Sequence, residues 1–92
     1  MDRLTHHARA RMQQRGITAA TLDALLDFGR TARAGSGCEI VFLDRKARQA
    51  LARARVISPS DAYRISNSYA IVESDGAVIT VGHRYRRIPR GR

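Results

Sequence analysis

The sequence predicts an α+β fold: two N-terminal helices, a short strand, a third helix, and then an antiparallel β-sheet that ends in a C-terminal hairpin. Three observations lead to this prediction. Apolar residues follow helical spacing between capping residues near the N-terminus, a short apolar run precedes a further helical pattern, and two alternating apolar runs flank Asp75-Gly76. The chain has 92 residues, enough for one modest core, so we expect a single domain over residues 1–92.

The N-terminal third of the chain predicts two helices joined by a tight corner. Thr5 can cap a first helix that runs to about Arg15, and Gly16 supplies the left-handed residue that commonly follows a helix. Thr18 can cap the second helix, and Gly29 ends it. The apolar residues expected to support these helices are Ala8, Met12, Ile17, Leu22, Leu25, Leu26 and Phe28.

The middle of the chain predicts a loop, a strand and a helix. Residues 30–37 contain two glycines and a serine and are expected to form a mobile loop. The apolar run from Cys38 to Leu43 is typical of a strand, with Cys38 in the core. Asp44 can cap a third helix that ends near Arg55, and Ser58-Pro59-Ser60 breaks it, with only β-structure expected after the break. The polar face of this helix carries Arg45, Lys46, Arg48, Gln49, Arg53 and Arg55.

The C-terminal part predicts a β-hairpin. Asp75-Gly76 between alternating apolar runs is a strong signal for a two-residue hairpin turn. Such a turn fixes the register of the two strands, because each further pair is counted back from it. The pairs expected are Ser74 with Ala77, Val72 with Ile79, and Ala70 with Val81.

This register assigns the polar residues of the last strand to two faces. His83 shares the core face with the apolar residues, whereas Arg84 lies on the other face with Thr80 and Tyr69. A bulge at Gly82, where glycine favours one, would bring His83 and Arg84 together. Without that bulge, His83 packs against the helices.

Composition excludes several classes of protein. Hydrophobic residues make up 43% of the chain and charged residues 27%, which is typical of a globular protein and argues against general disorder. No window approaches the ~18 apolar residues of a membrane span, and the first residues lack the apolar stretch of a signal peptide. Cys38 is the single cysteine, so a reducing compartment, the cytoplasm, fits best.

The formal charge of +9 indicates an anionic partner. Seventeen basic residues face eight acidic ones, and such an excess attracts polyanions such as RNA at long range. A solvated basic protein with no dedicated partner is the alternative. Binding to a membrane surface is disfavoured, because no segment pairs a wide apolar face with a basic one.

Two clusters could hold functional chemistry. His7, Arg11 and Arg15 recur every four residues and form one stripe of the first helix, unless this is only a solvated basic face. Residues 82–92 contain five arginines, a histidine and a tyrosine but no acid, which suits phosphate contacts and base stacking. The alternative for this segment is a frayed basic tail. We expect no cofactor and no metal, because the three histidines lack ligand spacing.

The chain resembles the bacterial family DUF4258 (domain of unknown function). The resemblance rests on the pattern HAxxRMxxRGI, from His7 to Ile17, and on the late strand from Ile79 to Arg84. That family is similar in predicted fold to the barnase and RelE-like ribonuclease toxins (the BECR fold). The resemblance implies RNA cleavage without a metal, or descent from an enzyme that did so. The functional roles that the resemblance implies can be assigned only to His7, Arg11, Arg15, Thr80 and His83. The third helix looks like an insertion that the shortest members of the family lack.

The hypothesis that follows is a metal-independent endoribonuclease. His7 and His83 would supply acid and base, arginines would hold the phosphate, and Thr80 and Tyr69 would position the substrate. The expected catalytic residues are His7, His83, Arg11 and Thr80. The expected nucleic-acid-binding residues are Arg15, Tyr69, Arg84, Tyr85, Arg86 and Arg87.

Three functions therefore remain open at the level of sequence. The first is a toxin-like ribonuclease that acts on RNA, free or on the ribosome, and is held by an acidic antitoxin. The second is a nucleic-acid-binding module without catalysis, which needs only the charge and the arginine-rich strand. The third is a protein-binding inhibitor that acts through its basic face.

Overall fold

The computed structural model describes residues 4–83, which form an α+β fold of four helices and one four-stranded antiparallel sheet. The fold class and the rough order of its elements are as the sequence predicts. The elements are α1 (His6–Arg15), α2 (Ala19–Phe28), β1 (Arg30–Gly35), β2 (Cys38–Phe42), α3 (Arg45–Ala54), α4 (Pro59–Ile65), β3 (Ser68–Glu73) and β4 (Val78–His83).

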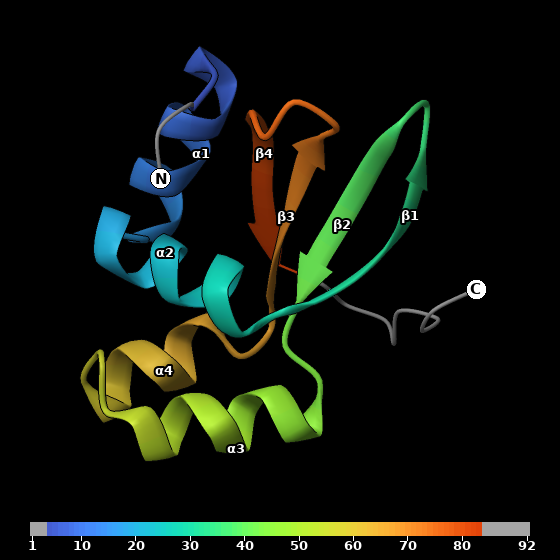
Figure 1. Cartoon of the computed structure of the whole chain (residues 1–92). Coiled ribbons are helices and arrows are strands. Elements are labelled where there is room, and N and C mark those ends of the chain that lie inside the picture. Colours follow the sequence, from blue (N-terminus) through green and yellow to red (C-terminus); the bar gives the residue numbers. More distant parts are fainter. Residues whose placement is uncertain (1–3, 84–92) are drawn as a thin grey trace.

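The strands follow one another across the sheet in the order β1-β2-β3-β4, so β1 and β4 are its edges. Helix α1 packs along β4, and α2 contacts both β2 and the pair formed by α3 and α4. Figure 1 shows α1 and α2 on the β4 side of the molecule, α3 and α4 side by side below them, and β1 on the opposite side. The polar stripe of α1 is therefore brought next to the last strand.

Caps define the two N-terminal helices as the sequence predicts. The Thr5 side chain accepts a hydrogen bond from the Ala8 backbone N–H (3.1 Å), and Gly16 ends α1 with a φ of 67°. Thr18 caps α2 by accepting from the Thr21 N–H (3.2 Å). Each cap satisfies a backbone donor that the first helical turn would otherwise leave unpaired.

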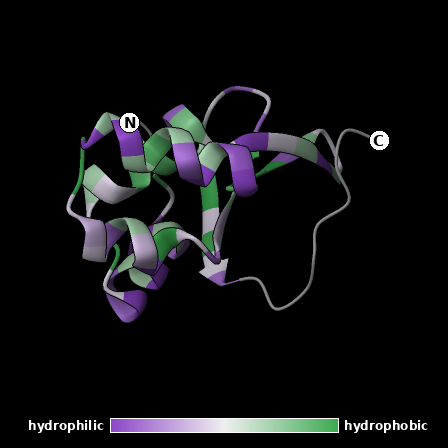
Figure 2. Cartoon of the chain, turned by 90° about the horizontal axis from the view of Figure 1, so that it is seen from below, coloured by the Kyte–Doolittle hydropathy of each residue, from purple (hydrophilic) through white to green (hydrophobic). Residues whose placement is uncertain are grey.

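The core lies between α1, α2 and the sheet and continues under α3 and α4. Hydrophilic and hydrophobic bands alternate along the helical ribbons (Figure 2), because each helix buries one stripe and exposes the other. Within residues 4–83, no helix is long and apolar enough to span a bilayer. The largest fully buried side chains are Phe42, Leu22, Leu25, Leu43, Leu51 and Ile65.

Residues 30–35 form a strand, and the prediction of a loop over residues 30–37 was wrong. Strand β1 pairs with β2 from Arg30 opposite Phe42 to Gly35 opposite Cys38. The turn is confined to Gly35, Ser36 and Gly37, which all have positive φ, and Gly35 is also the last residue of β1. Pairing with an apolar neighbour made residues 30–35 a strand despite their polar composition, a tertiary effect that local sequence does not reveal.

The break at Ser58-Pro59-Ser60 also begins a helix, so the prediction of only β-structure after it was wrong. The Ser58 hydroxyl accepts a hydrogen bond from the Asp61 N–H (3.1 Å), and Pro59 is the first residue of α4. Proline is favoured at that position because its missing N–H would be unpaired there anyway. The same residue thus separates α3 from α4 and starts α4.

The turn between β3 and β4 is longer than the predicted two-residue turn. The Glu73 N–H donates to the Ala77 carbonyl (2.9 Å), and Val72 faces Val78 instead of Ile79. One extra residue at Ile79 then shifts the register, so that Ala70 faces Val81 as predicted. The pairs expected for Ser74 and Val72 were therefore wrong, because the strands end before Asp75-Gly76 and the extra residue is absorbed at a bulge.

Candidate nucleic-acid interface

Helix α1 runs beside the edge strand β4 in the same direction. The Thr5 N–H donates to the Val78 carbonyl (3.0 Å), and the Thr5 hydroxyl donates to the Ile79 carbonyl (3.1 Å). Leu4 forms a parallel bridge with Val78. These contacts tie the start of α1 to the start of β4, so the last turn of the helix comes near the end of the strand.

The predicted stripe of α1 extends along this junction. His7 is exposed, whereas Arg11 and Arg15 are half-buried. The Nε atoms of Arg11 and Arg15 are buried and have no hydrogen-bond partner within the described part of the chain. A buried donor without a partner costs about 1–3 kcal/mol of folding free energy. Two such atoms in one stripe distinguish it from a purely solvated basic face.

His83 ends β4 on the face that α1 covers. Its Nδ1 lies 3.4 Å from the hydroxyl of Ser68, the residue directly opposite on β3. Burial of the ring and, after it, the charge of Arg15 lower the pKa of His83 below its ordinary value of 6.5. The imidazole is therefore neutral at pH 7, and the Ser68 hydroxyl orients its ring.

Arg15, Ser68 and His83, with Arg11 one turn earlier on α1, form what we call the α1–β4 cluster. It combines a neutral histidine, a hydroxyl and two guanidinium groups. Arginines of this kind can hold a phosphate through paired N–H donors, and a neutral imidazole can accept a proton from a nucleophile. The arrangement suits binding of a phosphodiester, and its histidine is in the state that a general base requires.

His7 lies one turn before Arg11 and is distant from the end of the cluster that holds Arg15 and His83. Eight residues separate His7 from Arg15, which is about 12 Å along the axis of α1. His7 follows Thr5, which is bonded to the start of β4, whereas His83 is at the end of that strand. An acid and a base acting on one phosphate must both be within hydrogen-bond reach of it. The structure therefore does not bring His7 and His83 together as a pair.

Thr80 and Tyr69 share the opposite face of the sheet, as predicted. Thr80 faces Ile71, and Tyr69 faces Gly82 in continuous register. The Tyr69 ring crosses over Gly82, since a Cβ added at Gly82 would lie 2.9 Å from the Tyr69 hydroxyl oxygen. Both side chains are half-buried. The sheet separates them from His83, so they form a second polar surface and do not complete the α1–β4 cluster.

Strand β4 has its bulge at Ile79. The alternative from the sequence, a bulge at Gly82, is not found, because pairing is regular there. Ala70, Tyr69 and Ser68 pair in sequence with Val81, Gly82 and His83. The space over Gly82 is occupied by the Tyr69 ring, which keeps this part of the ladder regular. His83 consequently packs towards the helices. The segment that follows His83 was predicted to bind nucleic acid and lies outside the described residues. Its predicted contacts are Arg84, Tyr85, Arg86 and Arg87.

Ser68 is the member of the cluster that sequence reasoning missed. The predicted register already held the signal, because the count that pairs Ala70 with Val81 also pairs Ser68 with His83. A small hydroxyl residue at the start of a strand has no local pattern that marks it as a partner for a histidine 15 residues later. Ser68 is fully buried, which makes its contact with the ring part of the core.

Residues suited to metals and redox chemistry are dispersed over the described part of the chain. Between residues 4 and 83, no three side chains of His, Cys, Asp or Glu gather as a metal site would require. Cys38 was expected in the core but is half-exposed, with its Sγ 3.9 Å from the Ser36 carbonyl oxygen. The difference arises because Cys38 begins β2 beside an exposed turn.

In comparisons with known proteins, no protein-family model, no curated protein and no solved structure matches this chain.

Proposed function

We propose that this is a small basic protein of the cytoplasm that targets RNA and cleaves it without a metal ion, in the manner of a toxin-like endoribonuclease. The observation that supports this proposal is the α1–β4 cluster, in which a histidine with a lowered pKa lies beside Arg15 and is oriented by Ser68. The net charge of +9 supports a polyanionic substrate.

The cluster suggests a mechanism with one proton-transfer group. Neutral His83 takes the proton of the ribose 2′-hydroxyl, whose oxygen attacks the adjacent phosphorus. Arg11 and Arg15 stabilise the negative charge that develops on the phosphate oxygens. The imidazolium of His83 then returns its proton to the departing 5′-oxygen. The products are a 2′,3′-cyclic phosphate and a 5′-hydroxyl, which keeps atoms and charge in balance.

A second candidate is a module that binds nucleic acid without cutting it. It is favoured by the positions of His7 and Thr80, since neither side chain lies with His83 and the cluster has a single proton-transfer group. An acidic protein partner, an antitoxin for the enzyme or a target for an inhibitor, would meet the same basic surface. Steep salt dependence without product formation would distinguish binding from cleavage.

The test is cleavage of end-labelled RNA in EDTA, followed on a denaturing gel, with and without ribosomes. We expect the wild-type protein to produce 2′,3′-cyclic ends. His83→Ala should lower the rate by about 10²–10⁴-fold and Arg15→Gln by about 10²–10³-fold. His7→Ala is the matched control, because His7 is on the same helix but about two turns from Arg15 and His83, and it should cleave normally. Circular dichroism checks that each variant folds.

Two results would contradict the proposal. Unchanged cleavage by His83→Ala would remove the histidine from the mechanism. RNA that stays intact in every lane, with tight binding by the folded protein, would establish the second candidate in its place.

A further inference from the structure

Helix α3 has a strongly basic outer surface that the α1–β4 cluster does not include. The helix and its C-cap contain five cations, every one exposed, and we call them the α3 basic face: Arg45, Lys46, Arg48, Arg53 and Arg55.

The direction of this face is fixed by the packing of the helix. Ala47 and Leu51 are buried, and α3 contacts α2 and α4 through that stripe. Lys46 and Arg53 are seven residues apart, which is two helical turns or about 10 Å, so both project from one exposed row. The face is therefore a rigid row of cations on the outside of the molecule, next to α4 (Figure 1).

The charges of this row have no partner within residues 4–83. Asp44 is the one acid in residues 44–55, and it already pairs with Arg30 and caps the helix. The first turn of α3 contains no acid but holds Arg45 and Lys46, at the positive end of the helix dipole. Arg45 and Arg48, three residues apart, repel each other along one face. This pattern weakens the helix, so the fold itself does not account for it.

We propose that the α3 basic face binds the phosphate backbone of a nucleic acid, as a second surface that is independent of the α1–β4 cluster and of any cleavage there. Guanidinium groups on a fixed helix suit phosphate oxygens, and contacts to the backbone need no base sequence. Tyr63, on the neighbouring α4, is 83% exposed and offers a ring on which a base can stack.

An anionic membrane fits this face less well than a nucleic acid. Peripheral helices enter a membrane surface through an apolar side, and the apolar stripe of α3 is already buried against α2 and α4. A row of cations without an available apolar side matches a solvated polyanion.

The test compares two variants that remove the same amount of charge. Lys46→Gln/Arg53→Gln neutralises two cations of the face, and Arg9→Gln/Arg33→Gln neutralises two exposed arginines of α1 and β1. Binding to a fluorescent single-stranded RNA is measured by anisotropy from 50 to 200 mM salt. Each lost phosphate contact lowers the slope of log affinity against log salt by about 0.7, so the α3 variant should lose about 1.4. The ratio of wild-type to variant affinity should therefore be about sevenfold larger at 50 mM salt than at 200 mM salt.

The control variant should keep the wild-type slope. Both variants should fold, since all four replaced side chains are exposed and glutamine is a good helix former at the three helical positions. Equal slopes for the two variants would overturn the proposal, because the effect would then come from net charge alone. It would also be overturned if the α3 variant lost binding to phosphatidylserine vesicles while its RNA slope stayed at the wild-type value.

Discussion

His83 is held towards its neutral form by its surroundings. Burial and the charge of Arg15 both disfavour the imidazolium, so its pKa is lower in the folded protein than in the unfolded chain. Below pH 6.5 the unfolded chain therefore binds a proton that the folded protein resists. Stability then rises with pH in this window, and the contribution of His83 is lost as the pH falls through its folded pKa.

His83→Gln should remove this part of the pH dependence. Urea unfolding of the wild-type protein from pH 7.5 to 5 should show a free energy of unfolding that falls as the pH decreases. The variant should show a flatter curve, and Arg15→Gln an intermediate one, because it removes only the smaller of the two causes. His6 and His7 are present in all three proteins, so a difference between the curves comes from His83 or Arg15. Parallel curves would mean that His83 ionises freely in the folded state.

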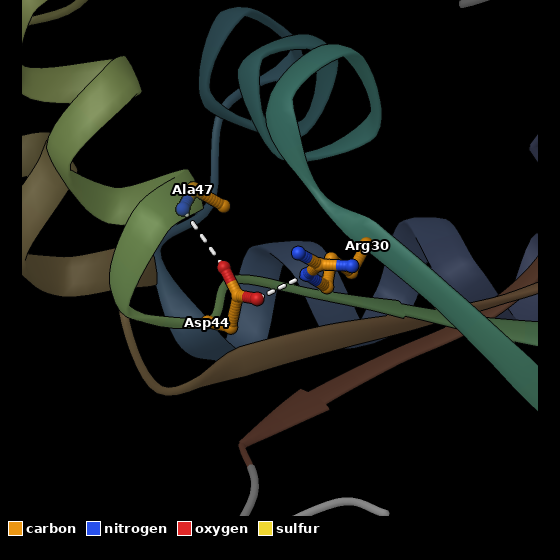
Figure 3. Close-up of polar contacts among 3 residues, drawn as sticks. All are labelled: Arg30, Asp44 and Ala47. Atoms are coloured by element: carbon orange, nitrogen blue, oxygen red, sulfur yellow. Dashed lines mark hydrogen bonds and ion pairs between the residues drawn. The ribbon is translucent and has the colours of Figure 1, made fainter. Parts of the chain in front are cut away.

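At the start of α3, the side chain of Asp44 connects the helix to strand β1 of the sheet. Asp44 is almost fully buried, and its Oδ1 accepts a hydrogen bond from the Ala47 N–H (2.8 Å). Its other oxygen meets the guanidinium of Arg30, the first residue of β1 (Figure 3). One carboxylate thus caps α3 and fixes the beginning of the edge strand. This contact compensates in part for the missing acid in the first turn of the helix.

Replacing Asp44 separates these two roles. Asp44→Ala removes the cap and the ion pair and should lower the free energy of unfolding by about 1–3 kcal/mol. Asp44→Asn keeps a capping oxygen and should retain most of the cap contribution, losing mainly the pair with the half-exposed Arg30. Urea unfolding measures both. If both variants lost the same free energy of unfolding, the charge of Asp44, and not its capping oxygen, would be the stabilising feature.

Helices whose ends are marked by capping residues could be predicted from the sequence. Strands and bulges that depend on pairing with a distant part of the chain could not. Thr5, Gly16 and Thr18 define helix ends by bonds within a few residues, and the structure confirms all three. Strand β1 has almost no apolar residues and depends on β2 beside it, which no local pattern reports. The bulge at Ile79 is likewise a result of fitting β4 to β3 while α1 holds its first residues.

In the candidate site, too, the features set by local sequence could be predicted and those set by strand pairing could not. The stripe of Arg11 and Arg15 follows from helical periodicity alone, and its place beside a strand does not. Whether His83 belongs with Arg15 or with Thr80 depended on the position of one extra residue in β4. Because a bulge reverses which side chains share a face, the chemistry of a sheet site is more sensitive to register than its fold is.

Charge acts on the molecule as a whole. The chain of 92 residues has a formal charge of +9 and folds to dimensions comparable with the Debye length at low salt, which is about 30 Å at 0.01 M. The basic residues of α1, β1 and α3 then repel one another across the protein, which destabilises the compact state. A polyanion that binds at the α1–β4 cluster or the α3 basic face relieves part of this repulsion, so binding and folding should be linked.

Salt should therefore stabilise this protein in the absence of any ligand. Raising NaCl from 0.01 to 0.3 M at constant pH shortens the Debye length to well below the size of the fold, so we expect the Tm to rise. Each 1 kcal/mol of relieved repulsion corresponds to about 4–8 °C in a domain of this size. The Arg9→Gln/Arg33→Gln variant carries two charges fewer and should gain less, which separates repulsion from general salt effects. A Tm that falls with salt in a calorimetric scan would mean that attractive pairs such as Arg30 and Asp44 outweigh the net charge. In that case the excess of cations is already neutralised within the fold, and long-range attraction of a polyanion loses its physical basis.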